Sequence, residues 1–260
     1  WELNDEDGDG VPDDQDDFPT DATKVRAIPT ELDLPELSLW YDMSVTNNLE
    51  VDQSTLKSLY DLSGNQRHAT QDVLADRALP ISGAFNGLGV ARFDGTESMP
   101  YDGTFLAGTD YTVLVVEARR SSKIHNYVTM SADSSTNKNL ILGYQTSSSA
   151  RFGQYGNDLI ESVPGYSSSK LKVLGAKLDS STGHTIYQDN VSLNSNTNKV
   201  QLISNDGAEI GGSTSSQKFD GDIAEIVMFN KALSDTEMDA IQSYFRNKWD
   251  LGDDDHDGVP

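Results

Sequence analysis

The sequence contains no cysteine, few basic residues and no long apolar run. Without cysteine, the chain has no disulfides, no thiolate metal site and no cysteine nucleophile. No run of 18 or more apolar residues occurs, so we expect no membrane-spanning helix. A secretory leader pattern is also missing. The chain begins at Trp1 without Met and stops inside a motif at Pro260, so we expect a piece of a longer polypeptide.

Basic residues number 19 against 42 acidic ones, giving a net charge of −23. The acidic excess gathers at the two ends. Residues 1–21 carry ten acids and residues 250–260 carry five, with no lysine or arginine in either segment. Residues 22–249 hold the other 27 acids and all 19 bases, a net charge of −8. This surface disfavours nucleic acid as a partner, and the crowded carboxylates at the tips require a cation.

Abundant Ser, Thr, Asn, Gly and Asp favour many short strands joined by polar turns. Apolar runs between turn residues predict strands at 111–118, 126–131, 139–144, 150–155, 170–179, 184–187, 199–204 and 219–230. Asp189 and Asn190 predict a tight hairpin, because both residue types tolerate positive φ. We therefore predict an all-β fold of two packed antiparallel sheets.

One helix is predicted at residues 234–249, near the end of the chain. Ser234 and Glu237 form a capping box, with the serine at the N-cap and the glutamate three residues on. Apolar residues then recur at helical spacing, at Met238, Ile241, Phe245 and Trp249. We expect this stripe to pack on the sandwich.

Residues 5–16 have the ligand order of a calcium loop. Acids stand at positions 1, 3, 5, 9 and 12 of the loop, which are Asp5, Asp7, Asp9, Asp13 and Asp16. Gly10 at position 6 permits the sharp turn, and Val11 at position 7 would offer its backbone carbonyl. Calcium takes six to eight oxygen ligands, which such a loop supplies. The alternative is an acidic linker that binds no ion specifically.

The pattern restarts at the other end with Asp253, Asp255, Asp257, Gly258 and Val259. The two copies share Asp-x-Asp-x-Asp-Gly-Val-Pro at an offset of 248 residues. The second copy stops before its last ligands. No helical pattern follows either copy, which argues against an EF-hand.

The two acidic tips resemble thrombospondin type 3 repeats, which residues 5–19 match throughout and residues 253–260 match in their first half. In bacteria such repeats link domains of secreted and surface proteins. The resemblance implies the same location for this chain.

Residues 37–251 resemble the bacterial concanavalin A-like and laminin G-like jelly rolls. The matching segments are 39–42, 61–69, 86–87, 91–95 and 219–234, with Lys248 and Trp249 at the end. The two resemblances together imply a calcium loop at 1–21, a linker at 22–36, a jelly roll at 37–251 and the start of a second calcium loop at 252–260. The jelly-roll resemblance says little about the ligand, because the superfamily includes lectins, adhesion modules and glycanases.

No catalytic constellation is evident. A Glu-x-Asp-x-x-Glu triplet and a Gly-x-Ser-x-Gly elbow are both missing. Asp222 and Glu225 form the best carboxylate pair, but their odd spacing predicts opposite faces of a strand. The four histidines are isolated in sequence, so zinc is poorly supported. We therefore expect a protein without enzymatic activity.

A ligand site would need aromatic side chains beside polar ones. The candidates lie in residues 143–169, which we expect to form sheet-end loops: Tyr144, Arg151, Tyr155, Asn157 and Tyr166. The alternative is that these tyrosines cover the rims of the sandwich. A second set of polar residues could surround a ligand or a metal: Asp42, Asp61, Asn65 and His68. We favour the alternative that they tie loops together through side-chain-to-backbone hydrogen bonds.

The sequence thus predicts a calcium-binding, non-catalytic module that binds a carbohydrate or cell-surface ligand. The resemblances imply a secreted or surface bacterial protein, such as an adhesin or a polysaccharide-processing enzyme. Two alternatives stay open, a calcium-rigidified spacer and a glycoside hydrolase or polysaccharide lyase.

Overall fold

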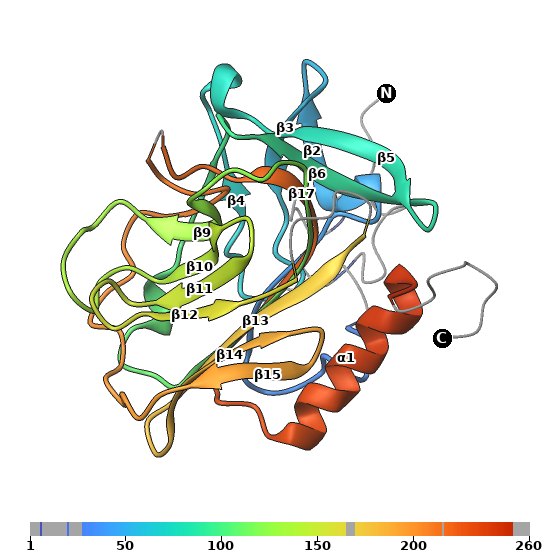
Figure 1. Cartoon of the computed structure of the whole chain (residues 1–260). Coiled ribbons are helices and arrows are strands. Elements are labelled where there is room, and N and C mark those ends of the chain that lie inside the picture. Colours follow the sequence, from blue (N-terminus) through green and yellow to red (C-terminus); the bar gives the residue numbers. More distant parts are fainter. Residues whose placement is uncertain (1–5, 7–19, 21–27, 165–169, 215, 252–260) are drawn as a thin grey trace.

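The computed structural model describes residues 6, 20, 28–164, 170–214 and 216–251. In this part of the chain all paired strands are antiparallel and form two large sheets and one small one, which confirms the predicted all-β class. Figure 1 shows the two large sheets packed face to face, with the helix α1 against the outer side of one of them.

The larger sheet has eight strands in the order β15-β14-β13-β8-β17-β6-β5, and β1 also pairs with β17. Its strands are β1 (Leu37–Asp42), β5 (Leu79–Phe85), β6 (Leu88–Asp94), β8 (Tyr111–Arg119), β13 (Lys172–Asp179), β14 (Gly183–Gln188), β15 (Val191–Ser195) and β17 (Asp220–Phe229). β6 pairs with residues 220–223 of β17 and β1 pairs with residues 225–229, so both strands share one edge of β17.

The second sheet has six strands in the order β12-β11-β10-β9-β16-β7. They are β7 (Met99–Tyr101), β9 (Asn126–Ser131), β10 (Ile141–Thr146), β11 (Ser149–Gly153), β12 (Leu159–Ser162) and β16 (Ala208–Ile210). A small sheet joins β2 (Leu49–Asp52), β3 (Thr55–Leu59) and β4 (Ala69–Thr70). Short 3-10 helices occupy η2 (Thr46–Asn48), η3 (Leu74–Asp76) and η4 (Thr104–Leu106).

The apolar run in β8 packs on both sides of the larger sheet. Val113 and Val115 belong to the core between the two sheets, whereas Leu114 and Val116 belong to a second core beneath α1. Successive side chains of a strand point to opposite faces, so a continuous apolar run predicts burial on both. β8 is fully buried for this reason.

The helix α1 (Asp235–Trp249) forms where the sequence predicts it. The Ser234 side chain accepts from the backbone N–H of Glu237, and the Glu237 side chain accepts from the N–H of Ser234, which completes the capping box. The predicted stripe is buried: Met238, Ile241, Phe245 and Trp249. Leu32, in the predicted linker, is also fully buried in the core beneath this helix.

The turn between β14 and β15 is the predicted hairpin, and Asp189 and Asn190 have φ of 50° and 66°. The strand predicted at 199–204 is wrong, because this segment is irregular and the nearby strand is β16. The Asn196 and Asn198 side chains accept from backbone N–H groups two residues on. Such local bonds compete with a strand ladder.

The expectation that Asp222 and Glu225 face opposite ways is also wrong. The pairing of β17 with β8 shifts register between Ile223 and Glu225. Ile223 and Ile226 both face the inter-sheet core, so one extra residue lies between them. This bulge reverses the alternation and turns Glu225 toward α1, on the same side of the sheet as Asp222.

Candidate functional site

The polar residues at 61–68 hold a loop together. The Asp61 carboxylate accepts from the backbone N–H groups of Trp40, Ser63 and Arg67, each at 3.0 Å. His68 Nδ1 accepts from the N–H of Asp61 at 2.9 Å. Asn65 and Asp42 also bond backbone groups. These contacts confirm the loop-tying interpretation of the sequence.

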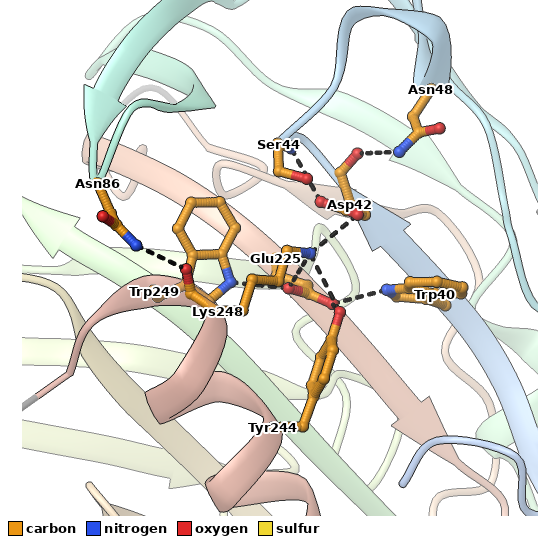
Figure 2. Close-up of polar contacts among 9 residues, drawn as sticks. All are labelled: Trp40, Asp42, Ser44, Asn48, Asn86, Glu225, Tyr244, Lys248 and Trp249. Carbon is orange, nitrogen blue, oxygen red and sulfur yellow. Dashed lines mark hydrogen bonds and ion pairs between the residues drawn. The ribbon is translucent and has the colours of Figure 1, made fainter. Parts of the chain in front are cut away.

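Glu225 is the centre of the polar cluster drawn in Figure 2. Its side chain is fully buried and accepts four hydrogen bonds at 2.7–2.9 Å. The donors are the indoles of Trp40 and Trp249, the Tyr244 hydroxyl and the Lys248 ammonium. Three of these donors come from α1 and one from β1. The cluster therefore fastens the helix to the sheet.

Lys248 extends this cluster to a second acid. Its ammonium lies 2.7 Å from Glu225 Oε2 and 2.9 Å from Asp42 Oδ2. Burial and the nearby Asp42 charge raise the pKa of Glu225, while Lys248 opposes that shift. Both Glu225 oxygens already have donors, so they offer nothing to a ligand. We interpret the cluster as structural.

Arg151 lies on the outer face of the six-stranded sheet, since its strand neighbours Ala150 and Phe152 point into the core. Its guanidinium contacts the Tyr127 hydroxyl at 2.9 Å and Asp158 at 2.5 Å. A side chain on Gly153 would clash with Asp158, because a Cβ there would lie 1.7 Å from its Oδ1. Tyr127 and Asp158 thus bind the two terminal nitrogens of Arg151, whereas its Nε lacks a hydrogen-bond partner among the described residues.

Two other predicted ligand residues lie in the turn that follows β11. Asn157 donates to the Asn137 side chain, and Tyr155 has positive φ and is 38% exposed. Tyr166 lies outside the described residues. Residues 143–162 form most of β10, β11 and β12, so the expectation of sheet-end loops here is wrong. The strands predicted at 139–144 and 150–155 correspond to β10 and β11, and β12 is the one of these three strands that the sequence analysis missed.

Tyr144 faces the opposite way from Arg151, into the space between the sheets. Its ring is fully buried, and its hydroxyl donates to Glu117 Oε1 at 2.5 Å. Gln188 Nε2 donates to the same hydroxyl at 3.4 Å. The Arg119 guanidinium lies 3.7 Å from the centre of the Tyr144 ring. The structure therefore separates Tyr144 from the other predicted ligand residues.

A pocket of about 200 Å³ opens beside Tyr144, and we call it the Glu117 pocket. Its lining residues are Glu117, Arg119, Tyr144, Pro164, Lys170, Lys172 and Gln188. Glu117 is 1% exposed, and its Oε2 has no hydrogen-bond partner among the described residues. Burial raises the pKa of Glu117 to about 7, against the opposing effects of the Tyr144 hydrogen bond and the Arg119 charge. A buried polar atom facing a cavity is typical of a binding site.

Sequence reasoning found Tyr144 but missed Glu117, Arg119, Lys172 and Gln188. A signal was present, because Glu117 follows Val113 and Val115 at the same alternate positions of an otherwise apolar run. A charged residue at a core-facing position is more informative than an exposed one. The other partners lie on strands distant in sequence, and no local pattern connects them.

Among the described residues, no group of three or more His, Cys, Asp or Glu side chains is arranged to hold a metal ion. Both predicted calcium loops, at 5–16 and 253–259, lie outside the described residues. In the part of the chain that the structure describes, no helix is long and apolar enough to cross a membrane.

The described residues define an antiparallel β-sandwich with a C-terminal helix and a polar pocket between the sheets. No protein-family model matches the sequence, and no curated protein matches it either. Solved structures with the same fold were found at low sequence identity.

One similar structure is domain 4 of AbnA, an extracellular arabinanase from Geobacillus stearothermophilus, in complex with arabinotriose. It has a TM-score of 0.58 and 17% identity, and the match covers 79% of this chain and 98% of that one. The binding domain of Paraclostridial Mosquitocidal Protein 1 has a TM-score of 0.57 and 16% identity, over 81% and 52% of the chains. Trypanosoma rangeli sialidase in complex with the inhibitor DANA has a TM-score of 0.57 and 13% identity, over 81% and 33%. These similarities establish the fold.

Proposed function

We propose that this protein is a calcium-binding, non-catalytic module that binds a glycan in the Glu117 pocket. One observation carries the proposal. Glu117 lines the pocket, and its Oε2 is buried and lacks a hydrogen-bond partner among the described residues. Leaving such an atom unpaired costs about 1–3 kcal/mol, so a ligand that pairs with it gains that energy.

The pocket suits one sugar ring. Its volume of about 200 Å³ is below the roughly 300–1,000 Å³ of sites for drug-sized ligands. Carboxyl, amide, hydroxyl and guanidinium groups line it at Glu117, Gln188, Tyr144 and Arg119. Sugar hydroxyls both donate and accept hydrogen bonds, and the four side chains together offer both donors and acceptors. The arabinotriose complex of a domain with this fold supports the choice of a glycan.

The calcium loops and the secreted or surface location belong to the same proposal. They are supported by the resemblance of residues 5–19 and 253–260 to thrombospondin type 3 repeats. The concanavalin A-like, laminin G-like resemblance of residues 37–251 supports a binding role in an adhesin or a polysaccharide-processing enzyme.

A glycan array probed with the 260-residue chain in calcium tests this function. We expect binding to at least one polysaccharide class, and we expect Glu117→Ala to reduce that binding at least tenfold. The matched control is Ile160→Ala, because Ile160 is half exposed on β12, away from the pocket. An array without any bound glycan would favour the calcium-rigidified spacer instead. Equal losses in both variants would place the glycan elsewhere.

One observation favours the hydrolase alternative, since a glutamic acid with a pKa of about 7 is suited to act as a general acid. Glycoside hydrolysis needs a second carboxyl group across the bond. Glu117 is the sole carboxylate among the described residues that line the pocket. The nearby Asp189 pairs with Lys172 at 3.0 Å and accepts from the Val173 N–H. Product release from a polysaccharide panel would support this alternative.

A further inference from the structure

The Glu117 pocket is basic in a strongly acidic protein. Three of its charged lining residues are cationic, Arg119, Lys170 and Lys172, and one is acidic, Glu117. The whole chain carries a net charge of −23. We propose that the pocket binds the carboxylate group of an acidic sugar, such as a uronic acid; this inference rests on the proposed glycan-binding function.

The hydrogen bonds around Glu117 give its free oxygen a definite role. The Tyr144 hydroxyl donates to Oε1, and its own oxygen accepts from Gln188. When Glu117 is neutral, its proton therefore resides on Oε2, which is the oxygen without a partner among the described residues. A neutral carboxyl group donates through that proton to an acceptor in the pocket. A ligand carboxylate is a strong acceptor, and Arg119 supplies compensating positive charge. The ammonium of Lys172 already lies 3.0 Å from Asp189.

Charged and titratable groups from several elements set the protonation of Glu117. Arg119 lies on the same strand, Tyr144 on β10 and Lys172 on β13, while Asp189 lies in the β14–β15 turn. Lys170 lines the pocket just before β13. Burial is the largest influence and raises the pKa to about 7, with Asp189 acting in the same direction and Tyr144, Arg119 and Lys172 against it.

The affinity for a carboxylate should therefore depend on pH. Below pH 7 Glu117 is neutral and donates to the ligand. Above pH 7 it becomes an anion that repels the ligand, so the affinity should fall by up to roughly tenfold per pH unit. A neutral sugar has no charge to be repelled, and its affinity should not fall in this way.

The test measures binding of monosaccharides to the 260-residue chain by NMR titration at pH 5.5 and pH 8.5. The probes are sodium glucuronate, galacturonate and N-acetylneuraminate, with glucose and galactose as neutral controls. We expect at least one acidic sugar to bind tenfold or more weakly at pH 8.5 than at pH 5.5. Glu117→Gln keeps a neutral donor at this position, so it should bind that sugar equally at both pH values.

A second variant covers the case in which Glu117→Gln does not fold. Tyr144→Phe removes a hydrogen bond that lowers the pKa of Glu117, so the midpoint of the affinity profile should move to higher pH. An unmoved midpoint in a folded Tyr144→Phe variant would contradict the role of Glu117. Sodium acetate and an acetylated glutamate peptide are further probes, and equal affinity for them would overturn the assignment to a sugar.

The remaining outcomes separate this inference from the function beneath it. Neutral sugars that bind as tightly as acidic ones, without pH dependence, would overturn the carboxylate inference and leave glycan binding intact. Glycan binding on the array without binding of any acidic monosaccharide would also overturn the carboxylate inference and leave glycan binding intact. If no glycan on the array binds, both the proposed glycan-binding function and the carboxylate inference are overturned.

Discussion

Glu117 and Glu225 are fully buried glutamates that the fold uses in different ways. Glu225 accepts from four donors and joins α1 to β1 and β17. Glu117 lines the pocket and accepts from Tyr144 on one oxygen, and its other oxygen has no hydrogen-bond partner among the described residues. A buried carboxylate is costly unless it is paired, so the number of donors distinguishes an anchor from a site open to a ligand.

The free energy of unfolding should depend on the protonation state of Glu117. Its pKa is about 7 in the folded state against 4.5 for the unperturbed group. The folded state thus holds this proton more tightly, and the associated stability is present below pH 4.5 and lost as the pH rises through 7. Between pH 5 and pH 8 the free energy of unfolding of the wild type should fall by about 2–3 kcal/mol relative to that of Glu117→Gln. This figure follows from about 1.4 kcal/mol per pKa unit.

Urea unfolding of both proteins at the two pH values measures this difference. Glu31→Gln is the matched control, because Glu31 is exposed. Its difference from the wild type should be the same at both pH values. A parallel response of wild type and Glu117→Gln would show that Glu117 is not neutral in the folded protein.

At the scale of elements, α1 and β17 depend on each other. The bulge in β17 turns Glu225 toward the helix, and Lys248 and Trp249 from the last turn of α1 bind it. Ile241 is fully buried in the middle of the same interface. Polar contacts thus attach the last turn of α1 to the sheet, and apolar packing attaches the rest of the helix.

Ile241→Asp tests whether this apolar packing holds α1 on the sheet. The substitution places an unpaired charge in the core beneath α1, and it should lower the free energy of unfolding by about 3–5 kcal/mol. Thr236→Asp adds the same charge at an exposed position in the first turn and should change stability by no more than about 0.5 kcal/mol. Thermal melting compares the two variants. An unchanged melting temperature for Ile241→Asp would mean that the helix is not docked in solution.

At the scale of the whole molecule, one residue of the predicted linker and the last described residue contact the same hydrophobic cluster. Ile28 and Leu251 both pack against the core beneath α1. The Glu117 pocket lies between the two sheets, and its lining residue Lys172 also lines a second pocket together with Leu251.

Calcium should order the acidic amino-terminal segment. The five carboxylates of residues 5–16 must come within about 5 Å of one another to share one ion, and their repulsion opposes this without a cation. We expect calcium to release or absorb measurable heat in a calorimetric titration and to protect residues 1–25 from proteolysis. The control replaces Asp5, Asp7 and Asp9 by Asn, which removes three ligand charges. Equal cleavage with calcium and with EDTA, together with no heat of binding, would contradict the loop.

The sequence by itself determined the features that depend on neighbours along the chain. The capping box at Ser234, the stripe on α1 and the Asp189–Asn190 hairpin follow from interactions within a few residues, and the alternating strands follow from the period of two. The tertiary structure alone decided the candidate site. Tyr144 lies 27 residues from Glu117 in sequence and Gln188 lies 44 residues from Tyr144, and packing of the two sheets brings them together. The bulge that redirects Glu225 has the same origin, since it depends on which strands share the edge of β17. Contacts between distant strands leave no periodic trace in the sequence, and for that reason the fold class was predictable and the pocket was not.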